Sequence, residues 1–185
     1  MLFAKPGEEN SHETVRLAVE YAREAGVKHI VVASYSGATA GLLAPYASEF
    51  NIVVVGQVYG FGGDGATNPM TPEVRRKLEG AGMKVYMGTL VLSGAERGLS
   101  NRFQGVYPVE IVAHTLRMFS QGVKVGVEIS VMALDAGLIP HGQPVVAIGG
   151  SRRGADTAIL IQPAHAQRLL DTKVIDVICK PKPAH

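Results

Sequence analysis

The sequence has a single cysteine, Cys179, among its 185 residues, so no disulfide can form within the chain. So little cysteine is typical of proteins from a reducing compartment, and we expect a cytoplasmic protein. The first residues contain only a short apolar stretch, Leu2–Ala4, which does not make a signal peptide. No apolar run approaches the ~18 residues that a membrane-spanning helix requires, so no membrane partner is expected.

The sequence also carries little net charge. Its 18 Lys and Arg residues and 16 Asp and Glu residues leave a formal charge of +2, which is too small to predict nucleic-acid binding. Apolar residues make up 46% and charged residues 18%, which argues against intrinsic disorder. No linker or shift in composition divides the chain, and we expect one domain over residues 1–185.

Several motifs of catalysis and metal binding are missing. There is no G-x-S-x-G elbow and no Walker loop. The histidines do not have a metal-ligand spacing such as H-E-x-x-H, so no metal is expected; they stand at positions 12, 29, 114, 141, 165 and 185.

Short apolar runs that alternate with helical patterns are what the sequence does contain. Strands are predicted at Lys28–Ala33, Ile52–Val55, Lys84–Met87, Val145–Ile148, Thr157–Ile161 and Val174–Cys179. Helices are predicted from Asn10, with Glu13 in a capping-box spacing, and at Gly37–Ala44, Pro72–Gly80, Pro108–Phe119 and Val123–Ala136. This order predicts an α/β fold in three α/β/α layers around a mostly parallel sheet of about five or six strands.

A hydroxyl-rich turn follows the first predicted strand. The residues Ser34-Tyr35-Ser36-Gly37-Ala38-Thr39-Ala40 lie where that strand ends and a helix begins. Free backbone N–H groups and the helix dipole favour an anion at such a place, and three hydroxyls are available to donate to phosphate oxygens. The alternative is that Ser36 simply caps the helix.

Two segments resemble the C-terminal α/β domain of pyruvate kinase. The first runs from Val31 through the Ser36-Gly37 pair to Val55, and the second is Gly149-Gly150-Ser151-Arg152-Arg153-Gly154-Ala155-Asp156-Thr157-Ala158. The resemblance covers most of the chain, and the helical stretches at 106–112 and 127–133 are similar to small stand-alone prokaryotic proteins of this type. It implies that the first turn grips a sugar phosphate and that the second segment is an effector loop. It also implies subunit contacts and thus a homo-oligomer.

Two departures from that family affect the expected function. Pyruvate kinases often have a basic residue after the Ser-Gly pair, where this chain has Ala38. Charge for a phosphate would then come from Arg152 and Arg153, although these residues also fit a solvated basic turn. A catalytic (β/α)₈ barrel alone needs about 250 residues, so we expect no pyruvate kinase activity.

A glycine-rich loop with two aromatic rings follows the second predicted strand. Tyr59 and Phe61 stand among its glycines and are able to close over a flat ring system, although an ordinary surface loop would look the same. A ring and a phosphate together suggest FMN, and the resemblance to the stand-alone proteins agrees with a bound flavin. A sugar phosphate is the alternative.

Two acidic residues complete the candidates. Asp156 either pairs with an arginine of its loop or contacts a sugar or ribityl hydroxyl. Glu128 lies in an apolar helix, seven residues before Asp135, and is either a general base or a structural partner of a basic group.

These observations leave three hypotheses of function, and whether the protein is an enzyme stays open. The first is a domain that binds a phosphorylated small molecule between Ser34–Thr39 and Gly150–Thr157. The second is a flavin-dependent oxidoreductase or a sugar-phosphate enzyme, and the third is a regulatory or assembly module.

Overall fold

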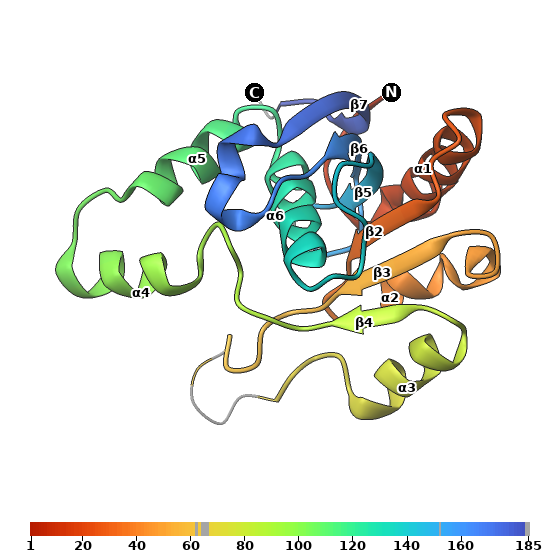
Figure 1. Ribbon diagram of the computed structural model, residues 1–185, viewed down its shortest axis with the longest axis horizontal. Coiled ribbons are helices and arrows are strands. Elements are labelled where there is room, and N and C mark those ends of the chain that lie inside the picture. Colours follow the sequence, from red (N-terminus) through yellow and green to blue (C-terminus); the bar gives the residue numbers. More distant parts are fainter. Residues whose placement is uncertain (62, 64–66, 152, 184–185) are drawn as a thin grey trace.

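Seven strands form one sheet in the order β1-β7-β6-β5-β2-β3-β4 (Figure 1). The structure is a computed structural model that describes residues 1–61, 63, 67–151 and 153–183. The strands are β1 (Leu2–Phe3), β2 (His29–Ala33), β3 (Asn51–Val55), β4 (Lys84–Tyr86), β5 (Val145–Gly149), β6 (Thr157–Gln162) and β7 (Lys173–Pro181).

The sheet is mostly parallel, as predicted. Strands β2, β3, β4 and β5 pair in parallel, and β7 and β1 pair in parallel at the other edge. Among the strands of the described residues, only β6 runs antiparallel to its neighbours β5 and β7. All six predicted strands are present, but the expected number was too low by one, because β1 has only two residues and shows no periodicity. The N-terminal ammonium donates to the carbonyl oxygen of Ile178 at 2.6 Å and holds this first strand beside β7.

Helices cover both faces of the sheet, which confirms the three-layer architecture (Figure 1). The α-helices are α1 (Ser11–Glu24), α2 (Ala38–Gly41), α3 (Pro72–Gly80), α4 (Gly94–Phe103), α5 (Pro108–Arg117) and α6 (Gln121–Asp135), with short 3₁₀ turns at Glu8–Asn10, Ala44–Tyr46 and Ala166–Asp171.

Alternate residues of each central strand enter different cores. Ile30 and Val32 of β2 pack with Val19 of α1, and α2 and α3 lie on the same face. Val31 points to the opposite face and packs in the cluster that contains Val127 of α6. The middle of each central strand is therefore apolar on both faces, which is typical of strands buried on both sides.

Helix α6 is buried around almost its whole circumference, because it lies between the sheet and α5. Its N-terminus lies at the edge of the sheet where β5 ends. A Cβ atom at Gly149 would come 2.5 Å from the carbonyl oxygen of Gly122, so this glycine lets the first turn of α6 approach the strand.

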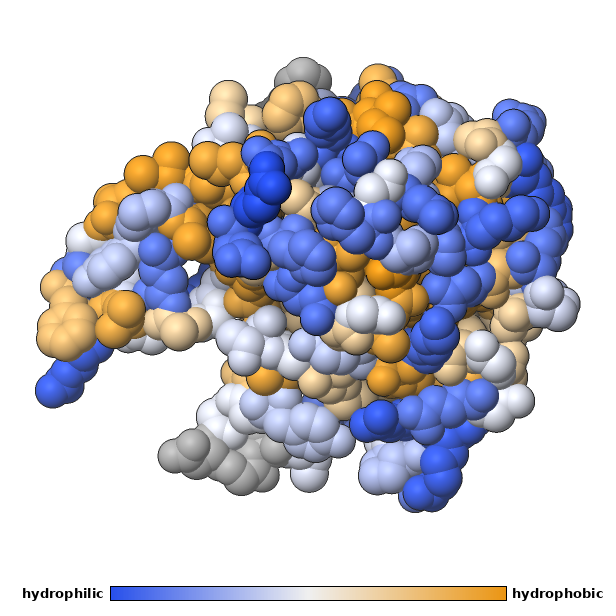
Figure 2. Space-filling model, in the orientation of Figure 1, coloured by the Kyte–Doolittle hydropathy of each residue, from blue (hydrophilic) through white to orange (hydrophobic). Residues whose placement is uncertain are grey.

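Helices α4 and α5 form an arm, residues 94–119, that extends from the side of the molecule (Figure 1). The described side chains of α4 include none that is buried, and α5 buries only Ala113. Figure 2 shows apolar side chains gathered on the outer surface of this arm.

The N-terminus of α1 differs from its prediction. Asn10 does not cap the helix with its side chain, which donates instead to the carbonyl oxygens of Lys5 and Gly7. Glu13 pairs with Arg16 one turn later. The capping-box spacing is present, but the 3₁₀ turn before α1 takes over the start of the helix.

Candidate functional site

The turn after β2 is shaped by its own hydrogen bonds. Ser34 donates its backbone N–H to the carbonyl oxygen of Val55 at 3.0 Å, and its Oγ accepts from the N–H of Ala40 at 3.2 Å. Gly37 has a φ of 93°, and a Cβ atom there would overlap Val74 of α3. The turn is thus held in place by the sheet below it and by α3 beside it.

The helix after this turn is shorter than expected. The prediction was Gly37–Ala44, but α2 covers only Ala38–Gly41. A single turn has little dipole, so the charge for an anion has to come from side chains. Ser36 does not cap the helix either, because Gly37 is the N-cap residue and no side chain caps it.

The second loop, between β5 and β6, is tied down from below. Asp156 is fully buried, and its Oδ2 accepts from the backbone N–H groups of Gly7 and Ser151, each at 3.2 Å. Thr157 is also fully buried and donates to Asp156 Oδ1 at 2.8 Å. These two residues support the loop from beneath instead of facing outward. Arg152 lies outside the described residues.

The two loops meet in an outer hollow of about 540 Å³. Ser36, Ala38 and Thr39 come from the first loop, and Arg153 and Gly154 come from the second. Gly154 has a φ of 73°, and a Cβ atom there would overlap Ser11 at the start of α1. The structure therefore brings together the two segments that the sequence singled out.

An inner cleft of about 270 Å³ adjoins the outer hollow. Ser34, Tyr35, Thr39 and Gly154 line both, so the two spaces are neighbours. Gly150, from the second loop, lines the inner cleft only.

Three cationic side chains line the inner cleft: Arg97 of α4, Arg117 of α5 and Lys124 of α6. Among the described lining residues they face a single carboxylate, that of Glu128. Arg117 donates from Nε to Gln121 Oε1 at 2.7 Å, which fixes its position. The inner cleft thus has an excess of positive charge.

Family comparison gives this arrangement a context. The model of the pyruvate kinase alpha/beta domain family matches residues 12–161. The chain belongs to this family. Strand β7 and strand β1, which together form one edge of the sheet, lie outside the matched residues.

Solved pyruvate kinases are similar to this chain in structure. One pyruvate kinase from Cryptosporidium parvum is 19% identical, with a TM-score of 0.42, and the match covers 81% of this chain and 22% of that protein. A second structure of the enzyme from Cryptosporidium parvum is 20% identical, with a TM-score of 0.39, and the match covers 78% and 21%. The chain spans about a fifth of the length of the pyruvate kinases that it matches.

In this member of the pyruvate kinase domain family, Glu128 is part of a buried ion pair. Lys124 Nζ lies 2.6 Å from Glu128 Oε2, and both side chains are only 4% exposed. The other carboxylate oxygen accepts from the backbone N–H of Leu92 at 2.9 Å. Of the two interpretations of Glu128, the observed contacts fit the structural partner, and Glu128 also lines the inner cleft.

The pKa of Lys124 is lowered from its usual value. Burial is the main cause, because it disfavours the charged ammonium. The attraction of Glu128 opposes this effect, while Arg117 and Arg97 lower the pKa further.

Asp135 does not share a site with Glu128. Seven helical residues separate the two along ~10 Å of α6. Asp135 is the last residue of α6 and contacts His165 Nδ1 through Oδ1 at 2.7 Å. The two carboxylates therefore have different surroundings, and Asp135 does not line the inner cleft.

The aromatic loop contributes one ring to the site. Phe61 is 57% exposed and lines the inner cleft. Tyr59, on the same loop, is 61% exposed and lines neither the inner cleft nor the outer hollow. Tyr35, which is 54% exposed, lines both spaces and was not expected to.

Arg97, Arg117 and Lys124 are the residues that the sequence analysis missed. Lys124 had a visible signal, since it stands four residues before Glu128 in an otherwise apolar helix. The two arginines had none, because they come from separate helices that only the tertiary structure brings to one cleft.

Two features are absent from the part of the chain that the structure describes. Within the described ranges of the chain, no helix has the length and hydropathy needed to cross a bilayer. The same residues hold no group of three or more His, Cys, Asp or Glu side chains placed to bind a metal ion.

Proposed function

We propose that this domain binds a phosphorylated small molecule in the inner cleft and the adjoining outer hollow. The observation that carries the proposal is the excess of positive charge in the inner cleft. Lys124 pairs with Glu128, the one carboxylate among the described lining residues, and the charges of Arg97 and Arg117 remain. An uncompensated cation in a partly enclosed space attracts a dianion strongly, and arginine suits phosphate because its guanidinium donates two parallel hydrogen bonds.

FMN is the first candidate ligand. The residues present fit both of its parts: the cations suit the phosphate, and the exposed rings of Tyr35 and Phe61 at the rim suit a flat ring system. A bound flavin would supply hydride or electron transfer, as the hypothesis of a flavin-dependent oxidoreductase requires. A sugar phosphate is the second candidate, because the inner cleft is slightly smaller than the ~300 Å³ at which typical ligand pockets begin.

Calorimetric titration with FMN, riboflavin, glucose 6-phosphate and inorganic phosphate tests the proposal. We expect FMN or glucose 6-phosphate to bind and riboflavin to bind more weakly, because riboflavin lacks the phosphate. Arg117→Gln removes one charge-assisted contact of about 1.5–3 kcal/mol and should weaken binding of the phosphorylated ligand by about 10- to 150-fold.

Arg75→Gln is the matched control, since Arg75 is an exposed arginine of α3 that pairs with Glu79 and does not line either space. It should leave the affinity unchanged. Equal binding of FMN and riboflavin, or no binding of any of the four compounds, would contradict the proposal.

Three further proposals concern the activity, the location and the self-association of the protein. We propose no pyruvate kinase activity for these 185 residues, since a catalytic barrel of about 250 residues has no room in them. A cytoplasmic location is supported by the single thiol, which is buried and free. Self-association through the arm is supported by its exposed apolar side chains: Leu99, Phe103, Val106, Ile111, Met118 and Phe119.

A further inference from the structure

The Lys124–Glu128 pair is an unusual group to find in a ligand cleft. Both side chains are almost fully buried, yet both line the inner cleft. A buried ion pair alone contributes little to stability, because desolvation offsets the attraction between the charges. The pair stands beside Arg97 and Arg117, which are available for an anion.

We propose that Lys124 forms an imine with the carbonyl group of a phosphorylated aldehyde or ketone bound in the inner cleft. This inference rests on the proposed function and narrows its ligand to the sugar-phosphate class. Arg97 and Arg117 hold the phosphate, and the amine of Lys124 reaches the carbonyl carbon.

The surroundings of Lys124 favour a reactive amine. A lysine becomes a nucleophile when its pKa falls, and desolvation or a neighbouring cation lowers that pKa. Both causes act here: the side chain is 4% exposed, and two arginines lie in the same cleft. An anionic ligand on the arginines would also concentrate the carbonyl beside the amine.

Glu128 is placed to move the protons that the reaction requires. Its Oε2 lies 2.6 Å from Lys124 Nζ, within the reach of direct proton transfer. Its Oε1 accepts from the N–H of Leu92 and from Ser93 Oγ, at 2.9 and 3.5 Å, so the carboxylate does not rotate freely.

The step is balanced in atoms and charge. The ammonium of Lys124 gives one proton to Glu128, and the neutral amine adds to the carbonyl carbon. The nitrogen of the adduct carries two protons, and one of them moves to the new alkoxide, which gives a neutral carbinolamine. Glu128 returns its proton to the hydroxyl group, which leaves as water as the C=N bond forms. The product is a protonated imine, so the positive charge next to Glu128 is the same before and after.

Borohydride trapping tests the proposal. The wild-type protein is incubated with dihydroxyacetone phosphate, reduced with sodium borohydride and mapped by peptide mass spectrometry. We expect one adduct, located on Lys124. Inorganic phosphate should suppress it, and dihydroxyacetone, which lacks the phosphate, should label Lys124 at least tenfold less.

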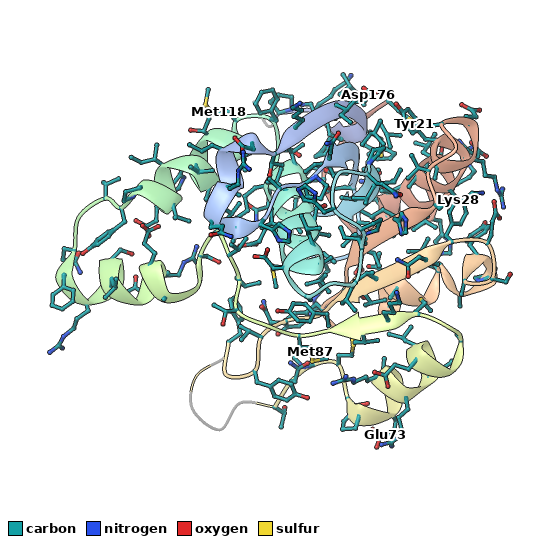
Figure 3. All side chains as sticks on the ribbon, in the orientation of Figure 1. Tyr21, Lys28, Glu73, Met87, Met118 and Asp176 are labelled. Atoms are coloured by element: carbon teal, nitrogen blue, oxygen red, sulfur yellow. The ribbon has the colours of Figure 1, made fainter. Side chains whose placement is uncertain are left out.

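Lys124→Arg is the decisive variant, because arginine keeps the charge beside Glu128 but does not form an imine. It should bind dihydroxyacetone phosphate and give no adduct at position 124. Lys28→Arg is the control. Lys28 is exposed and directly precedes β2, at the end of that strand opposite to the cleft, and it is labelled in Figure 3. This variant should be labelled like the wild type. If Lys124→Arg does not fold, the position of the adduct in the wild-type protein decides alone.

Thermal shifts measured on the same samples separate the two proposals. A shift with dihydroxyacetone phosphate but no adduct on Lys124, or labels spread evenly over exposed lysines, overturns the imine and leaves the proposed function standing. If neither a shift nor an adduct appears, the imine is overturned, and the titration with FMN and glucose 6-phosphate decides the proposed function separately. An adduct that is equal with dihydroxyacetone supports the reactive lysine and overturns the role of the arginines.

Discussion

Cys179 shows how far burial changes the chemistry of one residue. The side chain is fully buried in β7, within the core cluster that includes Val19 and Ile148. Desolvation raises the pKa of the thiol from its usual value of 9.0 to about 11, although a hydrogen bond from the backbone of Ala158 opposes the shift. Because the thiolate is the reactive form, this cysteine is inert in the native protein.

The raised pKa of Cys179 predicts a stability difference at high pH. Between pH 9 and 11 the unfolded chain loses the thiol proton while the folded chain keeps it, so this contribution is complete below pH 9 and is lost as the pH rises toward 11. Urea unfolding of the wild type and of Cys179→Ala at pH 8 and 10.5 should show the advantage of the wild type shrinking by about 2 kcal/mol. A pH-independent difference, or native-state reaction with a thiol reagent at pH 8, would contradict this account.

At the scale of elements, the site depends on hydrogen bonds between a loop and a helix that lie far apart in the sequence. The loop after β5 is held by Asp156, which binds the N–H of Gly7, and by Ser11, whose Oγ accepts from the N–H of Ala155 at 2.9 Å. The start of α1 therefore fixes the position of this loop.

Gly154→Ala tests the close contact between this loop and the start of α1. The substitution would place a methyl group against Ser11 and Glu8 at a φ of 73°, whereas Gly142 has a φ of 77° and no heavy atom within 4 Å of a Cβ there. Gly142→Ala should cost only the left-handed penalty of about 1–2 kcal/mol. Gly154→Ala should cost about 1–3 kcal/mol more, because α1 or the loop must also shift, and it should weaken ligand binding. Equal losses of stability in chemical denaturation would show that the loop moves freely.

At the scale of the whole molecule, the sheet body and the arm differ in how they are supported. The far edge of the body is fixed by long-range contacts, such as the hydrogen bond from Tyr21 of α1 to Asp176 of β7 at 2.9 Å. Figure 3 labels both residues, which lie close together. The arm extends outward, and Met118, which follows α5 where the arm rejoins the body, is 81% exposed (Figure 3). Contiguous exposed apolar surface of this kind often marks an interface.

The arm predicts concentration-dependent self-association. Sedimentation velocity of the wild type should show an oligomer, and the double substitution Phe103→Ser and Val106→Ser should shift it toward monomer by removing apolar contact area. Leu170→Ser, at an 85% exposed position outside the arm, should leave the distribution unchanged. A wild-type monomer at every soluble concentration would exclude this interface.

The sequence by itself determined the layers and the two loops of the candidate site. Runs such as Ile30–Ala33 and Val145–Ile148 are apolar throughout because both faces of the sheet are covered, and that requirement is readable in one dimension. Parallel neighbouring strands end at the same edge, so loops that follow β2 and β5 had to lie close together. The short strand β1 was not predicted, and the one-turn helix α2 was predicted too long. Elements of so few residues show no hydrophobic periodicity from which their bounds could be read.

Only the tertiary structure decided the charge of the site. Arg97 and Arg117 come from the arm, whose position over the cleft depends on packing against α6 and leaves no mark in the spacing of residues. Burial of Lys124 against Glu128 likewise follows from the way α5 and the sheet enclose α6. A sequence specifies which side chains are charged, but their desolvation and mutual distance arise only when separate elements meet.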